Sequence, residues 1–409
     1  MTARPGHDVA ALAAVAGQLS GQLATPPLHG PGLDSWQHQS LPAGAAGIAL
    51  LHGVRAQAGH GSPGRAHAWL SLATAAGVSA GPGSGLWFGA PAVAFAITAS
   101  APGQYRTASQ VLNQAIGGMA QARLEAAHER ISAAARPELS EYDLVRGLTG
   151  LGAYFLHCVP DPRLLRQILS YLVRLTEPVP AADAAGSAAP GWWTSSNPSI
   201  RASTADGHAN LGMAHGITGP LALLSLAMRQ EITVPGQAEA IDRIYAWLDG
   251  WRQPGPGGPW WPGWISLREL RDGHPSQTGP GRPSWCYGTP GLARALQLAA
   301  IARHDKARQA AAENALAQCI SDPAQITQLS GPGLCHGWAG TVTAAWHAAL
   351  DATSTHLDSA LDTLACSLAG SARGDHPYGL MQGIAGAALA LHAITTQIPG
   401  TWPSCLLIT

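Results

Sequence analysis

The chain has 409 residues, of which 46% are hydrophobic and 11% are charged, so it can build a full-sized core and is not globally disordered. Lys and Arg number 23 against 24 Asp and Glu, and this balance excludes a bulk electrostatic attraction to nucleic acid or to an anionic membrane. No apolar stretch is long enough for a membrane span, and six cysteines are too few for a disulfide scaffold in a chain of this length. We therefore expect a soluble, cytoplasmic protein with reduced thiols.

A short glycine motif returns seven times along the chain. Six copies read Gly-x-x-Gly, the second reads Gly89-Ala-Pro-Ala92, and each precedes a run rich in Ala and other apolar residues. The copies occupy residues 44–47, 89–92, 147–150, 216–219, 288–291, 337–340 and 383–386. The gaps between their last residues are 45, 58, 69, 72, 49 and 46 residues, and each gap has room for a helical hairpin with its loops.

The hydrophobic pattern of the repeats predicts two layers of helices. The run after each glycine motif is apolar on nearly all sides, which indicates a buried helix. The segments between the runs are amphipathic, as in residues 238–251, and such helices keep one face in water. We therefore expect an all-α fold, an α/α toroid with buried helices inside amphipathic ones, whose glycines permit close approach and unusual backbone angles. An open α-solenoid has the same period and is the alternative.

Three stretches rich in Pro, Gly and Trp interrupt the repeats, at residues 185–208, 253–283 and 325–333. They are longer than simple turns, and ordered loops of this length are usually functional. Their tryptophans either bind an apolar peptide segment or pin the loops to the body of the protein. None of these stretches resembles a flexible interdomain linker, so we expect residues 1–409 to form a single domain.

Cys286 and the pair Cys335-His336 each lie just before a glycine motif. Because adjacent repeats of a ring bring equivalent positions side by side, we expect the three side chains to converge at one end of the toroid. Two thiolates and an imidazole suit zinc, and three protein ligands leave a fourth position open, as in catalytic sites. The alternative is two buried cysteines that act as small hydrophobes beside an ordinary histidine. The sequence thus predicts one zinc ion per chain.

Three further polar residues lie near the glycine motifs. His215 directly precedes the fourth motif; a histidine suits a general acid or base, although most loop histidines are simply hydrogen-bonded. Asp143 comes shortly before the third motif and either lines the same rim or caps a helix and pairs with Arg146. Arg282, four residues before Cys286, either stabilises a developing oxyanion beside the metal or is a surface residue on a Gly/Pro loop.

Three segments together resemble the lanthionine synthetase C-like family, the lanthipeptide cyclases. They are WCYGTPG at 285–291, CHGWAG at 335–340 and AHGITG at 214–219, and the Asp143 repeat adds to them. The first two in combination are specific to the family, and the resemblance extends over most of the chain through the seven repeats. The chain departs from the pattern at Ala92, where the second glycine is absent, and the 58-residue gap that follows leaves little room for an added subdomain. With no dehydratase or kinase-like region ahead of the repeats, it is similar to the stand-alone type of cyclase.

The resemblance implies a fold and a set of site residues. The fold is a toroid of seven inner and seven outer helices. The implied ligands of a catalytic zinc are Cys286, Cys335 and His336. The implied active-site residues are His215, Asp143, Arg282 and Tyr287.

The implied reaction is the addition of precursor-peptide cysteine thiolates to dehydroalanine or dehydrobutyrine, which forms lanthionine or methyllanthionine thioether rings. Zinc would lower the pKa of the substrate thiol, and His215 would protonate the resulting enolate. Asp143 would orient His215 or help to remove the thiol proton, and Arg282 would stabilise the enolate oxygen. The implied partners are a dehydrated precursor peptide with its leader, a separate dehydratase and an exporter, in the cytoplasm or peripheral to a membrane-associated synthetase complex.

Other functions fit the same sequence less well. On the same fold, the alternatives are the addition of a small thiol such as glutathione to dehydrated residues, or a non-catalytic peptide-binding scaffold of a synthetase complex. A toroidal glycosidase or a terpene-type cyclase needs paired catalytic carboxylates or an Asp-rich cluster. The chain has only 24 acidic residues and no such cluster, so this class ranks last.

Overall fold

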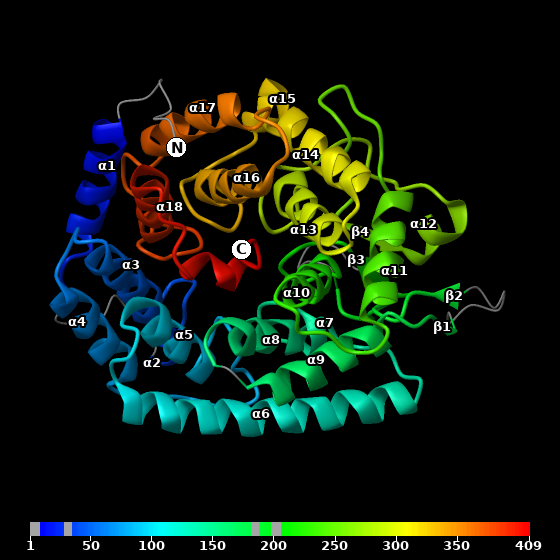
Figure 1. Cartoon of the computed structure of the whole chain (residues 1–409), viewed down its shortest axis with the longest axis horizontal. Coiled ribbons are helices and arrows are strands. Elements are labelled where there is room, and N and C mark those ends of the chain that lie inside the picture. The colour runs from blue at the N-terminus through cyan, green and yellow to red at the C-terminus, as the bar shows by residue number, and fades with distance from the viewer. Residues whose placement is uncertain (1–8, 28–34, 160, 181–187, 198–205) are drawn as a thin grey trace.

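The computed structural model describes residues 9–27, 35–159, 161–180, 188–197 and 206–409. Seven buried helices stand side by side around a central axis in this part of the chain (Figure 1). The last of them packs against the first, so the ring is closed and the open solenoid does not apply. In chain order they are α3 (Ala45–Gln57), α5 (Ala90–Ser100), α8 (Leu148–His157), α10 (Thr218–Arg229), α13 (Thr289–Ala302), α16 (Trp338–Asp351) and α18 (Ile384–Thr396).

A second ring of helices covers the first from outside, with one outer helix packed on each inner helix. In the order of their inner partners they are α4 (Pro63–Thr74), α6 (Arg106–Ser132), α9 (Pro162–Leu175), α11 (Gln237–Gly250), α14 (Lys306–Ser321), α17 (Asp358–Ser371) and α1 (Val9–Gln22). The helix α1 precedes all the repeats in the chain but packs on α18, the last inner helix. The predicted α/α toroid of seven inner and seven outer helices is therefore confirmed.

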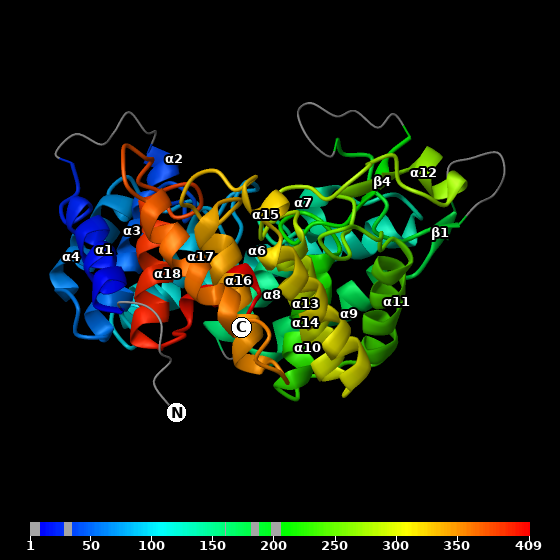
Figure 2. The ribbon, with the colours of Figure 1, turned by 90° about the horizontal axis from the view of Figure 1, so that it is seen from above.

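Most short elements lie in the connections at one end of the double ring (Figure 2). The antiparallel pair of β3 and β4 joins residues that are more than fifty positions apart in the chain. No helix within the described ranges has both the length and the apolar character needed to cross a membrane. The short elements are α2 (Ser35–His38), α7 (Leu139–Tyr142), β1 (Val179–Pro180), β2 (Ala188–Ala189), β3 (His208–Asn210), β4 (Trp264–Ser266), α12 (Leu267–Asp272) and α15 (Pro323–Ile326).

The glycine motifs lie at the N-terminal ends of the inner helices, and their two glycines have different tasks. In every repeat but the fourth, the helix begins directly after the first glycine, so the expected helix start is three residues too late. A Cβ at the last glycine would collide with the carbonyl oxygen six residues earlier: 1.9 Å for Gly291 and Trp285, and 1.9 Å for Gly340 and Leu334. Unusual backbone angles, which the sequence also suggests, occur only at Gly89 (φ 69°) among these helix caps.

Backbone hydrogen bonds link the turns that precede the inner helices into a nearly complete circle. Each bond runs from an amide of one turn to a carbonyl of the next, at 2.8–3.2 Å. The second and third turns are the exception, since no such backbone bond joins them in the described chain. The bonds are Leu41 N to Trp87 O, Leu144 N to Ala214 O, Met213 N to Cys286 O, Cys286 N to Cys335 O, Cys335 N to Met381 O and Met381 N to Pro42 O.

A C-terminal segment fills the centre of the ring. The side chains of the 3₁₀ helix η1 (Trp402–Leu406) and of the two residues after it are all buried. The Trp285 indole donates to the Leu406 carbonyl (3.0 Å), and the Arg294 Nε donates to the Ile408 carbonyl (2.8 Å). The ring is therefore a packed core and not an open channel.

The tryptophans of the long loops pin those loops to the body of the protein. Trp192, Trp193, Trp260 and Trp261 are all buried. The Trp261 indole donates to the carbonyl of Leu248 on α11 (2.8 Å), which ties the second loop to the outer ring. The expected stretch 185–208 falls partly outside the described residues, which omit 185–187 and 198–205.

The close approach at Gly291 gives a stability prediction. Gly291→Ala places a methyl group against the main chain of Trp285, where no side-chain rotation relieves the overlap, so we expect a loss of about 1–3 kcal/mol. The matched control is Gly118→Ala on α6, where a Cβ meets nothing within 4 Å and the helix gains up to about 1 kcal/mol. The thermal unfolding midpoints of the two variants, each compared with that of the wild type, test this prediction. Equal midpoints would contradict the assigned role of Gly291.

Candidate active site

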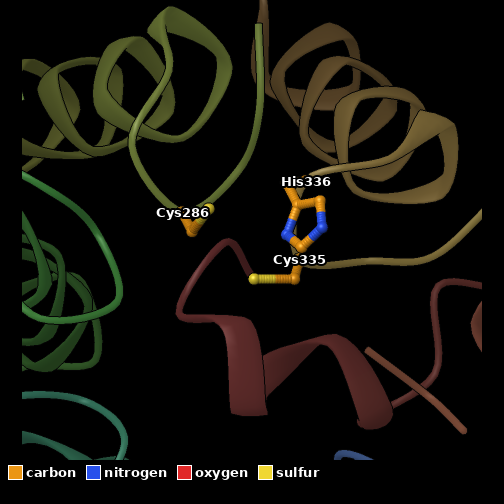
Figure 3. Close-up of side chains that lie close together, drawn as sticks. All are labelled: Cys286, Cys335 and His336. Carbon is orange, nitrogen blue, oxygen red and sulfur yellow. The ribbon is translucent and has the colours of Figure 1, made fainter. Parts of the chain in front are cut away.

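The turns before α13 and α16 bring three metal-binding side chains together. Cys286 comes from the fifth turn, and Cys335 and His336 come from the sixth (Figure 3). The bond from the Cys286 amide to the Cys335 carbonyl (3.2 Å) sets the register of the two turns. The sulfur atoms of the two cysteines and one ring nitrogen of His336 all lie within 4.8 Å of one another.

The donor set of this cluster fits zinc. Zn–S bonds of about 2.3 Å in a tetrahedron place two sulfurs about 3.8 Å apart, a separation that the spread of the three atoms allows. Two thiols and an imidazole are soft to borderline donors, which select zinc over magnesium or calcium. Three ligands leave a fourth coordination position for a substrate atom. In the described residues this is the one group of three or more His, Cys, Asp or Glu with such spacing.

The two cysteine thiols share a proton unequally. The hydrogen bond with Cys335 lowers the pKa of Cys286 well below its usual value, and bonds with His336 and Ser284 act in the same direction against burial. The pKa of Cys335 is correspondingly raised, because its thiol holds the proton that stabilises the Cys286 thiolate. The pair therefore loses its first proton easily, and a cation between the sulfurs would favour loss of the second.

His215 and Asp143 form a hydrogen-bonded pair beside this cluster. The His215 Nδ1 lies 2.7 Å from the Asp143 Oδ2. The Asp143 side chain is 3% exposed and that of His215 is 41% exposed, so the carboxylate is enclosed while the imidazole remains open to solvent. The amides of Met213 and Ala214 both point to the Cys286 carbonyl, which fixes the His215 turn next to the cysteine cluster.

The Asp143 carboxylate is oriented by its own turn. Its Oδ1 accepts hydrogen bonds from the backbone amides of Arg146 (2.7 Å) and Gly147 (2.8 Å). An ionised carboxylate only accepts, so the Nδ1 of His215 must carry the proton in this pair and its Nε2 is left to exchange a proton. Asp143 thus both caps its turn and orients His215, and it makes no side-chain ion pair with Arg146 among those found in the described chain.

Tyr287 follows Cys286 in the chain, and its ring lies near that of His215. Its ring centroid is 6.5 Å from that of His215, and its hydroxyl accepts a hydrogen bond from the Asn210 amide (3.0 Å). Burial raises the pKa of Tyr287 to about 12, although the bond from Asn210 acts in the opposite direction. The phenol is therefore neutral at physiological pH and keeps its own proton available for an acceptor.

Arg282 lies at the open edge of the cluster. Its side chain is exposed, and its positive charge favours the thiolate form of Cys335. The position thus combines access from solvent with an electrostatic effect on the cysteine cluster.

Two further residues of this site are not among those that the sequence motifs point to. Asn210, on β3, is fully buried and also accepts from the Gly212 amide (3.0 Å), so it fixes both Tyr287 and the turn that carries His215. The Ser284 hydroxyl lies 3.6 Å from the Cys286 sulfur and accepts from the Tyr287 amide (3.4 Å). A polar residue shortly before a glycine motif was the available signal. Cys366 lies in an apolar run, which predicts a packing residue, but its side chain is exposed.

Comparisons with known proteins agree with this architecture. A family model described as "Lanthionine synthetase C-like protein" matches residues 35–407. A solved structure described as "Nisin cyclase" superposes with a TM-score of 0.76 at 18% sequence identity, covering 97% of this chain and 96% of that chain. No significant match was found among curated protein sequences.

The two amide bonds to Asp143 give a second stability prediction. Asp143→Ala leaves the part-buried amide of Arg146 and the buried amide of Gly147 without this acceptor, at a cost of about 1–3 kcal/mol. Asp143→Asn keeps an acceptor oxygen at the same place and should lie closer to the wild type. Thermal unfolding of both variants tests this, and an equal loss in the two would show that the turn does not depend on the acceptor.

Proposed function

This chain belongs to the lanthionine synthetase C-like family, and on that premise we propose that it is a zinc-dependent lanthipeptide cyclase. The observation that carries the proposal is the convergence of Cys286, Cys335 and His336 beside a hydrogen-bonded His215 and Asp143. The substrate would be a dehydrated precursor peptide that contains cysteines and dehydroalanine or dehydrobutyrine. The toroidal fold alone could serve a non-catalytic scaffold. The cluster of metal-binding side chains and the adjacent acid–base pair support a catalyst.

The proposed reaction is an addition that needs no oxidant or second substrate. The S–H bond of a peptide cysteine breaks, and the sulfur forms a C–S bond with the β-carbon of the dehydrated residue. The electron pair of the C=C bond moves toward the carbonyl as an enolate, and a proton then returns to the α-carbon. The product is an isomer of the substrate with one thiol fewer for each ring.

Cys286, Cys335 and His336 would hold the zinc, one ion per chain. Zinc held there would lower the pKa of a substrate thiol, which would favour its thiolate form at neutral pH. The burial of Cys286 and the partial burial of the other two ligands limit competition from water at the three protein donors.

His215 would move the proton in this reaction. Its Nδ1 is held by Asp143, so the ring has one orientation and the other nitrogen is free to exchange a proton with the substrate. With 41% of its side chain exposed, His215 can meet a bound peptide, whereas the enclosed Asp143 cannot. We therefore assign proton transfer to the α-carbon to His215 and orientation of its imidazole to Asp143.

Arg282 and Tyr287 would stabilise the negative charge that develops on the substrate carbonyl. The exposed guanidinium of Arg282 acts on the same side of the site as Cys335. The hydroxyl of Tyr287 already accepts from Asn210, so its own proton can be donated to an oxyanion.

A cavity beside the third turn, lined in part by Arg146, is a place where part of a peptide substrate would bind. It has a volume of about 230 Å³, and its lining includes Trp36, Phe88 and Arg146. The Arg146 guanidinium lies over the Phe88 ring, 5.4 Å from its centroid. Two aromatic rings and one cation suit a peptide side chain, and neither Asp143 nor His215 lines this cavity. The precursor would carry its leader, with a separate dehydratase and an exporter as further partners in the cytoplasm.

The function is tested with a synthetic peptide that contains one dehydroalanine and one cysteine. Ring formation removes the free thiol, measured by alkylation, and leaves the peptide mass unchanged. Addition of a small thiol such as glutathione would instead raise the mass by that of the thiol and leave the cysteine free. Binding of the peptide with neither change would favour the scaffold. Either of the last two outcomes would overturn the cyclase.

Metal content can be measured independently of the reaction. Purified protein is expected to contain about one zinc per chain, and Cys286→Ala is expected to lose the metal and the activity together. The control is Cys366→Ala, which removes an exposed cysteine outside the cluster and should keep the zinc. Full zinc content in Cys286→Ala would exclude the proposed site.

The role of His215 is tested by keeping the metal and removing the imidazole. His215→Ala is expected to retain zinc but to slow turnover by about 10²–10⁴-fold, the range typical for loss of a general acid. His356→Ala, an exposed histidine between α16 and α17, should turn over like the wild type. If His215→Ala also loses its zinc, then His215 is a ligand and its proposed role is wrong.

A further inference from the structure

The outer helix α6 carries an arginine whose hydrogen bonds all go to main-chain carbonyls. The Arg123 Nη1 donates to the Arg146 carbonyl (2.5 Å), and its Nη2 donates to those of Pro82 (2.9 Å) and Ser84 (2.6 Å). No ion pair to a carboxylate is found for Arg123 in the described chain. A half-buried guanidinium that holds three carbonyls is suited to fixing backbone and not to pairing charge.

Arg123 lies where the circle of backbone hydrogen bonds is open. The second and third turns lack the amide-to-carbonyl bond that joins the other neighbouring turns. Pro82 and Ser84 belong to the approach to the second turn, and Arg146 belongs to the third. The guanidinium therefore replaces the absent backbone bond with three bonds that span the same gap.

The same bonds lead directly to the acid–base pair. The Arg146 carbonyl and the Gly147 amide are the two ends of one peptide group. Arg123 donates to the oxygen of this peptide group. The N–H of the same peptide group, from Gly147, donates to the Asp143 Oδ1 at 2.8 Å. A cation on the carbonyl polarises the peptide group and makes its N–H a stronger donor. The other oxygen of Asp143 holds the His215 Nδ1.

We propose that Arg123 is a positioning residue that sets the geometry of His215 through the Arg146–Gly147 peptide group and the Asp143 carboxylate. The inference deepens the proposed function, since it assigns to α6 a part in the proton transfer that His215 would perform. Arg123 does not touch the substrate in this assignment. Burial lowers the pKa of Arg123, and the negative charge of the nearby Asp143 opposes that change.

The test compares Arg123→Met with a matched variant of the same helix, Arg130→Met. Arg130 is also half-buried, and it pairs with Glu141 (2.6 Å) and the Ala135 carbonyl (3.0 Å) without contacting the third glycine motif. The readout is the proton on the His215 Nδ1, observed by nuclear magnetic resonance of protein with ¹⁵N-labelled histidine. The signal is assigned by its absence in His215→Gln.

Arg123→Met is expected to move the Nδ1 proton signal upfield or to broaden it, because the hydrogen bond to Asp143 is weakened. It should also lower kcat on the dehydrated peptide by about 10- to 100-fold, with KM and zinc content unchanged. Arg130→Met should lower the thermal midpoint but leave the His215 signal in place. If Arg123→Met does not fold, Arg123→Gln replaces it, since the amide keeps one donor group without the charge.

A folded Arg123 variant with an unchanged His215 signal would overturn the inference. Arg123 would then only stabilise the loops whose carbonyls it binds. Equal displacement of the signal in Arg130→Met would do the same, because any loosening of α6 would then suffice. The magnetic resonance readout needs no turnover. A protein that cyclises no peptide but loses the His215 signal in Arg123→Met would refute the proposed reaction and keep the positioning role.

Discussion

The architecture depends on how closely the seven turns at one end of the ring approach one another. Each inner helix begins within such a turn, and backbone hydrogen bonds join neighbouring turns around the ring, except the second and third. The last glycine of a motif makes this possible, since a Cβ at Gly340 would lie 1.9 Å from the Leu334 carbonyl oxygen and 3.2 Å from the Trp285 side chain. The absence of a side chain at this glycine thus allows close packing within its own turn and against the neighbouring turn.

The site is a consequence of this register. Bonds from Met213 to Cys286 and from Cys286 to Cys335 hold the fourth, fifth and sixth turns in line, and each turn contributes one part of the candidate site. His215 comes from the fourth turn, and the cysteine cluster comes from the fifth and sixth. Hydrogen-bonded backbone therefore sets the positions of the three ligand atoms.

The repeat predicted the ring and the neighbourhood of the site residues, because equivalent positions of a closed ring must be neighbours. It could not predict which contacts fill the irregular places. Asn210 and Arg123 act through long-range hydrogen bonds to Tyr287 and to three carbonyls, and their local sequence does not specify these partners. The expected helix starts were late because the glycine motif reads as a turn, whereas its last three residues already have helical hydrogen bonding.

The two ends of the toroid are stabilised by different means, and this division bears on function. Away from the turns, side chains form a buried polar network: Arg294 contacts Asp351 (2.7 Å) and Gln297 (2.5 Å), and Gln297 donates to Glu313 (2.9 Å). At the turns, backbone bonds carry the connections and leave side chains such as His215 and Arg282 free to face solvent. The one gap in the backbone circle lies beside the turn that bears Asp143, so a side chain from the outer ring must close it. The orientation of the acid–base pair therefore depends on packing between the two rings, and not on the inner ring alone.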